Sequence, residues 1–156
     1  MIREKSCGAV VFTKTGNDIK YLLVQSTEGI YGFPKGHMES GESEEETALR
    51  EVLEETGVKI ELTSGFRKTT EYSIPKKDGT IKQVVYFLGE FQNQNVIYQR
   101  EELTGAYLLN YTEAITLLQF ENLKRILVDA DDYIRKKEGV LQKQQKFRMF
   151  ESNIKR

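Results

Sequence analysis

The sequence GHMESGESEEETALREVLEETGV, from Gly36 to Val58, holds the strongest pattern in this chain of 156 residues. Ser43 is followed three residues later by Glu46, the spacing of a helix-capping box, and Gly57 is a residue at which helices commonly stop. Four apolar residues recur on one helical face between them: Ala48, Leu49, Val52 and Leu53. The pattern predicts a helix over residues 43–56 that packs its apolar face against the core.

The same helix is unusually acidic. Between residues 42 and 55 the chain has one basic residue, Arg50, and seven glutamates: Glu42, Glu44, Glu45, Glu46, Glu51, Glu54 and Glu55. At about 100° per residue, Glu55 lies about 40° and Glu54 about 60° around the axis from Glu51, so these three carboxylates share one side and repel one another. A divalent cation would relieve that repulsion, and carboxylate oxygens suit Mg²⁺. Taken alone, the acidic run favours the simpler interpretation, an amphipathic helix whose glutamate face is solvated.

The segment before the helix is rich in turn-forming residues. Those that punctuate residues 27–40 are Gly29, Gly32, Pro34 and Gly36. They predict a loop with at most a short strand around Phe33. Such a loop can bring backbone carbonyls and amides to the acidic side of the helix. Glu42 favours the dipole at the helix start and can pair with Arg50, which would hold the loop against the helix.

The rest of the chain alternates strands with two further helices. Residues 7–12 and 20–25 flank TKTGND and predict a β-hairpin. Further β-branched and aromatic runs predict strands over residues 59–62, 65–74, 81–92 and 106–109, with PKKDGT as a turn between the second and third of these. Apolar residues at helical spacing predict helices over residues 112–118 and 121–133. We expect one domain of the α/β class.

Composition limits the environments and partners of the protein. Lysine and arginine number 23 against 24 aspartates and glutamates, so the net charge of -1 provides no global attraction to nucleic acid or to an anionic membrane. Cys7 is the only cysteine, which excludes an intrachain disulfide and favours a reducing, cytoplasmic location; we interpret it as a small core residue. We expect neither a secretory leader nor a membrane span. His37 is the only histidine, which argues against a histidine-rich zinc site.

The C-terminal segment differs from the rest of the chain. Residues 135–156 carry eight basic residues against Glu138 and Glu151, and their apolar content includes Phe147, Met149 and Phe150. We expect a domain over residues 1–134 and a basic extension over residues 135–156 that is weakly ordered or depends on packing. A solvated helical tail is the simpler interpretation, and binding of RNA or of a protein partner is the alternative.

The acidic helix and its loop match a known motif. The positions that define the Nudix box are occupied by Gly36, Glu42, Arg50, Glu51, Val52, Glu54, Glu55, Gly57 and Val58. The chain therefore resembles the Nudix hydrolases, and the resemblance implies an α/β/α sandwich with a mixed central sheet. It also implies that Glu51, Glu54, Glu55 and the Gly36 carbonyl bind Mg²⁺, which Mn²⁺ can replace. Glu54, or a loop carboxylate outside the helix, would be the base that activates water, and Arg50 would support the catalytic glutamates.

Residues on either side of the Nudix box narrow the resemblance to one group within the family. The runs GIYGFPKGHMESGES, VVYFLGEF and LNYTEAITLLQFENLK are similar to those of asymmetrical bis(5'-nucleosyl)-tetraphosphatases, and the similarity covers residues 6–133. It implies that the polyphosphate contacts Lys35, His37 and Lys82, and that Tyr72 and Tyr86 line or stack on the adenine. From the residues alone, both tyrosines could equally be sheet core, and Lys82 solvated surface. The acidic pair Glu101 and Glu102 falls about one residue from the position expected of that group's loop glutamate.

The expected function follows from this resemblance. It is Mg²⁺-dependent hydrolysis of a small nucleotide, diadenosine tetraphosphate, to ATP and AMP. Alternatives are a Nudix pyrophosphohydrolase acting on 5'-triphosphate RNA, ADP-ribose or nucleoside triphosphates, and a non-catalytic nucleotide-binding regulator. The sequence carries no signal for an oligomeric state.

Overall fold

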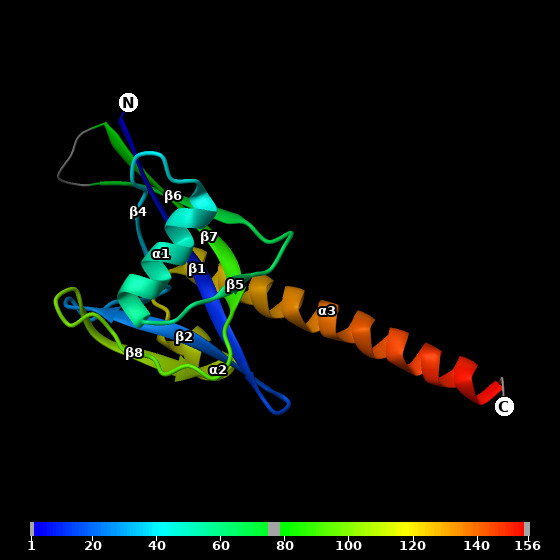
Figure 1. Cartoon of the computed structure of the whole chain (residues 1–156). Coiled ribbons are helices and arrows are strands. Elements are labelled where there is room, and N and C mark those ends of the chain that lie inside the picture. The colour runs from blue at the N-terminus through cyan, green and yellow to red at the C-terminus, as the bar shows by residue number, and fades with distance from the viewer. Residues whose placement is uncertain (1, 75–78, 155–156) are drawn as a thin grey trace.

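The computed structural model describes residues 2–74 and 79–154 of the chain (Figure 1). Within these residues lie eight strands: β1 (Ile2–Thr15), β2 (Asp18–Ser26), β3 (Tyr31–Gly32), β4 (Lys35–His37), β5 (Glu61–Leu62), β6 (Lys68–Ser73), β7 (Thr80–Glu90) and β8 (Leu103–Leu109). The helices are α1 (Glu44–Thr56), α2 (Tyr111–Leu117) and α3 (Glu121–Ile154). The predicted order of strands and helices is confirmed with one exception: two short strands, β3 and β4, lie on either side of Phe33, where at most one strand around Phe33 was expected.

The long strand β1 organises the sheet. Its C-terminal half pairs antiparallel with β2, and its N-terminal half pairs antiparallel with β4. On its other side it runs parallel to β7 along almost its whole length. Strand β6 then pairs with β7, and β8 pairs with β2, both antiparallel. The sheet is therefore mixed, as the resemblance implied.

The predicted hairpin is present and longer than expected. Strands β1 and β2 stay paired to Thr15 and Asp18, and Gly16 in the turn between them adopts a φ of 63°, which favours glycine. The apolar runs alone underestimated both strands because the hydrogen-bonded ladder continues into polar residues. The predicted PKKDGT turn falls mainly on residues 75–78, outside the described part of the chain.

Alternating side chains of β1 pack on opposite faces of the sheet. Cys7, Ala9 and Val11 lie in a cluster completed by Ala48 and Val52 of α1. Val10 and Phe12 lie in the other cluster, which side chains of α2 and α3 complete. Since one face is covered by α1 and the other by α2 and α3, the molecule is the predicted α/β/α sandwich (Figure 1).

Helix α1 begins and ends where the sequence predicted. Ser43 caps it with a complete capping box to Glu46, and Gly57 ends it in the left-handed conformation at φ 72°. The predicted apolar face is only half correct: Ala48 and Val52 are fully buried, whereas Leu49 and Leu53 are 38% and 41% exposed. The helix touches the sheet along a stripe narrower than the four apolar residues suggested.

Helix α3 does not end at residue 133 as predicted. It continues without interruption to Ile154 and extends as a long rod beyond the sheet (Figure 1). A buried polar contact fixes its first half: the Tyr21 hydroxyl donates to Asp131 Oδ1 at 2.5 Å, and Arg135 Nε donates to Asp131 Oδ2 at 2.8 Å. The boundary between a domain and a basic extension at residue 135 remains a prediction, and it falls inside this helix. No helix among the described residues is long and apolar enough to cross a membrane.

Candidate active site

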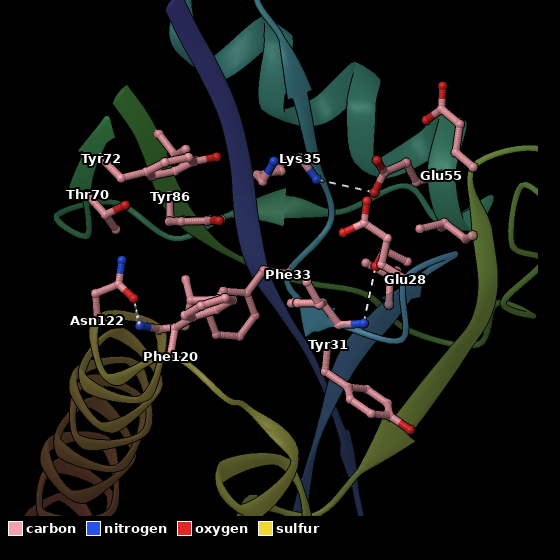
Figure 2. A pocket seen from close by; sticks show the side chains of 18 residues that line it. Glu28, Tyr31, Phe33, Lys35, Glu55, Thr70, Tyr72, Tyr86, Phe120 and Asn122 are labelled. Carbon is pink, nitrogen blue, oxygen red and sulfur yellow. Dashed lines mark hydrogen bonds between the residues drawn. The ribbon is translucent and has the colours of Figure 1, made fainter. Parts of the chain in front are cut away.

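A pocket of about 850 Å³ opens where the acidic helix, the loop before it and the sheet meet (Figure 2). On one side it is lined by Thr70 and Tyr72 of β6, Tyr86 of β7 and Phe120. Lys35 lies between this side and Glu55, which comes from the last turn of α1. The pocket therefore joins aromatic side chains to a cation and to the acidic helix.

Glu55 is the most buried carboxylate of the site. Its side chain is only 7% exposed, and its Oε2 accepts a 3.3 Å hydrogen bond from the backbone N–H of Lys35. Burial raises its pKa to about 8, and the neighbouring carboxylates Glu51 and Glu102 add to that shift. Lys35 opposes the shift through its backbone N–H and its charge, but the burial of the carboxylate prevails, and a cation would stabilise such a group.

Glu51 lies directly against the backbone of Gly36. A Cβ added at Gly36 would approach Glu51 Cδ to 2.0 Å, so only glycine leaves room for this carboxylate. The pKa of Glu51 is raised, chiefly by burial, although Arg50 opposes the shift. The two residues come together because β4 runs beside α1, and β4 is placed there by its pairing with β1.

Arg50 ties the loop to the helix, as predicted. Its Nε donates to Glu42 Oε2 at 2.6 Å, and its Nη2 donates to Glu42 Oε1 at 3.0 Å and to the His37 carbonyl at 2.9 Å. Its Nη1 donates to Glu51 at 2.9 Å and to Glu54 at 3.2 Å. The bidentate pair with Arg50 holds the pKa of Glu42 at about 2.

The predicted metal ligands are adjacent but do not form one closed cluster. Glu51 and Glu55 are turned inward, whereas the side chain of Glu54 is 52% exposed and pairs with Arg50. In the described part of the chain no group of three or more acidic, histidine or cysteine side chains is arranged to hold a metal ion. The donor chemistry nevertheless fits Mg²⁺, because Glu51, Glu54, Glu55 and the Gly36 carbonyl offer only hard oxygen atoms. The assignment of these four ligands stays a prediction.

The three predicted phosphate contacts are not equivalent in position. Lys35 lines the pocket, and burial, with help from the nearby ammonium of Lys82, lowers its pKa. Two cations held together in this way favour an anion between them. The side chain of His37 is exposed and lies outside the pocket lining, while its carbonyl is engaged by Arg50.

The two tyrosines expected to contact the adenine differ in how far they are exposed to the pocket. Tyr72 pairs with Lys82 across β6 and β7 and is 45% exposed at the pocket edge, where a ring face is accessible. Tyr86 is 2% exposed and packs edge to face on Phe33, with ring centroids 5.4 Å apart. Tyr86 thus forms the floor of the pocket. Burial raises the pKa of its hydroxyl.

Several lining residues were missed by sequence reasoning. Phe120 and Asn122 reach the aromatic side from the start of α3, and Glu28 lies in the turn between β2 and β3. Glu102, which the sequence placed one residue from its expected position, also lines the pocket and acts electrostatically on both Glu51 and Glu55. These residues stand singly in loops or at helix ends, so no periodicity marks them. The aromatic Phe120 just before a helix was the only visible signal.

Known proteins resemble this chain in both sequence and structure. Residues 3–130 match the NUDIX domain. The mouse asymmetrical bis(5'-nucleosyl)-tetraphosphatase is 33% identical over 142 residues, which cover 83% of this chain and 95% of that protein. The crystal structure of a Caenorhabditis elegans Ap4A hydrolase binary complex superposes with a TM-score of 0.78 at 24% identity, covering 85% of this chain and 98% of that one. The NUDIX domain of Shewanella oneidensis NrtR, solved with ADP ribose, superposes with a TM-score of 0.68 at 19% identity, covering 86% and 90%.

Proposed function

Because the chain belongs to the Nudix family of hydrolases, we propose that it cleaves diadenosine tetraphosphate into ATP and AMP with Mg²⁺ as its cofactor. Like its relatives, the protein is a hydrolase that acts on phosphoric anhydride bonds of nucleoside polyphosphates. The curated relatives that match most of its length, from mouse, rat and pig, carry the name of the asymmetrical tetraphosphatase. The choice of this substrate over other nucleotides is the part that needs a test.

One observation supports this substrate above all: the pocket is continuous from the exposed ring of Tyr72, past Lys35, to Glu55 and Glu102. A purine can stack on Tyr72 or Phe120, since every base offers a flat face to an aromatic ring. The phosphate chain then crosses the Lys35 and Lys82 ammonium groups, which neutralise part of its charge. The scissile phosphorus would lie at the acidic end, several phosphates away from the stacked base.

Each residue of the acidic end has a distinct role in this proposal. Glu51, Glu54, Glu55 and the Gly36 carbonyl would hold Mg²⁺, which lowers the pKa of water and neutralises phosphate charge when bound. Arg50 positions these groups by fixing Glu42 and the carbonyl of His37. Glu102 is the better candidate for the base that accepts the proton of water, because Glu54 is occupied by Arg50 whereas Glu102 lines the pocket.

The location of the protein remains part of the proposal. Its single cysteine, Cys7, is fully buried in the core under α1, where burial raises the pKa of its thiol to about 11. A buried thiol with a raised pKa is unreactive, so Cys7 shows no adaptation to an oxidising compartment. We therefore assign the protein to the cytoplasm.

The experiment is hydrolysis of diadenosine tetraphosphate in ¹⁸O-water with Mg²⁺, with separation and mass analysis of the products. We expect ATP and AMP in equal amounts, with the label in AMP, because water attacks the phosphorus that AMP retains. Two molecules of ADP would contradict the proposal. No cleavage, beside rapid turnover of ADP-ribose, a nucleoside triphosphate or 5'-triphosphate RNA, would assign the protein to the alternative.

A further inference from the structure

The turn between β2 and β3 forms the end of the pocket that the proposed adenine and phosphate contacts leave unused. Thr70 and Tyr72 come from β6, whereas Leu103 comes from β8, and three strands lie between these two in the sheet. At about 4.8 Å per strand, the two ends are separated by roughly 15 to 20 Å. The β2–β3 turn lies at the β8 end, and Ser26, Glu28, Ile30 and Tyr31 all contribute to the lining.

Hydrogen bonds inside the turn fix its shape. The Ser26 backbone N–H donates to the Ile30 carbonyl at 2.9 Å, and the Ser26 hydroxyl accepts from the Ile30 N–H at 3.2 Å. Gly29, at φ 82°, donates its N–H to the Ser26 carbonyl at 2.9 Å. Glu28 therefore lies on a hydrogen-bonded turn, and its side chain is one of those that line the pocket (Figure 2).

The carboxylate of Glu28 makes none of these contacts. Among the residues that the structure describes, no side chain or backbone group forms a hydrogen bond or an ion pair with it, and the residue is exposed. Among the described residues Glu102, at the same end, also has no such partner, whereas Glu42 and Glu54 pair with Arg50 and Glu55 accepts from Lys35. A fixed carboxylate without an internal partner is available to a ligand.

The charge around Glu28 selects the kind of ligand. Of the described residues that line the pocket, Lys35 is the single basic one, and it belongs to the middle. At the β8 end the charged lining consists of Glu28 and Glu102. Glu102 is the proposed base beside the scissile phosphorus, so a free phosphate terminus placed beyond it would meet the carboxylate of Glu28. A nucleoside would instead present hydroxyl donors to Glu28 and a flat base to the apolar surfaces of Ile30 and Leu103, in the way that acidic residues elsewhere accept from ribose hydroxyls.

We propose that the β2–β3 turn and Leu103 form a second nucleoside site, in which Glu28 accepts hydrogen bonds from the ribose and repels a free phosphate terminus. Glu28 is then the residue that selects polyphosphates capped by a nucleoside at both ends over those with one free end. The inference rests on the proposed function, because the second nucleoside is the one that leaves as AMP.

The test compares diadenosine tetraphosphate with adenosine 5'-tetraphosphate, which has the same number of phosphates and one free end. We expect the wild-type protein to prefer the capped substrate in kcat/KM. Glu28→Gln removes the charge with little change of shape, and Glu28→Lys reverses it. The preference should shrink in the first variant and fall by about tenfold or more in the second, with faster use of adenosine tetraphosphate. Glu61→Lys, at an exposed position of β5, is the matched control and should leave the preference unchanged.

The outcomes separate this inference from the proposed function. If the wild-type protein cleaves diadenosine tetraphosphate but both Glu28 variants keep its preference, the second site is refuted and the proposed function stands. If the wild-type protein does not cleave diadenosine tetraphosphate at all, both fall. An equal loss on both substrates with a lowered melting temperature would show that Glu28 acts through the fold, which also contradicts the inference.

Discussion

At the scale of single residues, Glu55 couples the site to pH. Its pKa is raised by burial from an ordinary value near 4.5 to about 8, so between these values the folded chain keeps a proton that the unfolded chain releases. Folding stability should therefore decrease as pH rises through this window when no metal is present. Melting temperatures measured in EDTA should show the decrease, and Glu55→Gln should make it shallower. Identical pH profiles for the two proteins would contradict the assignment.

Gly36 offers the clearest steric prediction. Gly36→Ala places a Cβ against the Glu51 carboxylate, which must move, and overpacking of this kind costs about 1 to 3 kcal/mol of stability. Turnover should fall at least as strongly, because Glu51 leaves its position. The control is Gly139→Ala, where nothing lies within 4 Å of the new atom and alanine favours the helix. Stability by urea unfolding and kcat separate the two; a Gly36→Ala protein with wild-type kcat would refute the close contact.

Alanine variants of Tyr72 and Tyr86 should affect different quantities, KM for the first and stability for the second. Tyr72→Ala removes an accessible ring and should raise KM with little effect on melting, with stacking worth roughly 1 to 3 kcal/mol. Tyr86→Ala removes a buried ring and should lower stability by about 3 to 5 kcal/mol. Kinetics and thermal unfolding of both variants are the measurement. A stable Tyr86→Ala protein with a raised KM would return Tyr86 to the stacking role.

At the scale of elements, the contact of Tyr21 with Asp131 holds α3 on the sheet. Asp131→Ala would leave the Tyr21 hydroxyl buried without this acceptor, which costs about 1 to 3 kcal/mol. Tyr21→Phe should cost less, since Asp131 keeps its pair with Arg135. Urea unfolding of both variants tests the order. Equal losses of stability in the two variants would contradict this prediction, because they would show that the buried Tyr21 hydroxyl loses nothing without its acceptor.

Elements with their own stop signals could be predicted from the sequence. Ser43, Glu46 and Gly57 defined α1, because caps act within a few residues. Leu49 and Leu53 were wrongly expected in the core, because how wide a face a helix buries is decided by what packs on it. The end of α3 was wrongly predicted for a related reason. The apolar periodicity ends where the helix stops contacting the sheet, but the helix itself continues to Ile154.

The site could be predicted in part for the same physical reason. Glu51, Glu55 and Arg50 lie on one helix, whose geometry fixes their mutual positions. Phe120 and Glu28 reach the pocket from separate loops, and only the tertiary fold brings them there. The positions of the acidic-helix residues could thus be predicted and their metal-binding roles stay predictions, whereas the residues that line the rest of the pocket needed the structure.

At the scale of the whole molecule, the outer part of α3 should be dispensable for catalysis. Of the residues that the structure describes, those that line the pocket all precede residue 124, and the anchor at Asp131 and Arg135 lies within residues 1–138. A chain ending at Glu138 should therefore keep kcat/KM for diadenosine tetraphosphate, whereas one ending at Val128 loses the anchor and should be less stable. Loss of activity in the longer, folded truncation would give the basic extension a part in the reaction.

The central position of β1 also has a consequence for how the protein reaches its native state. Strands β1 and β7 run parallel and are far apart in the chain, so their pairing must close a long loop before it gains stability. Proteins dominated by such non-local contacts have high contact order and refold slowly. Lys35 reaches the pocket through β4 on one side of β1, and Tyr86 through β7 on the other. Nucleotide binding should therefore return only in the last, cooperative phase of refolding, after secondary structure has formed.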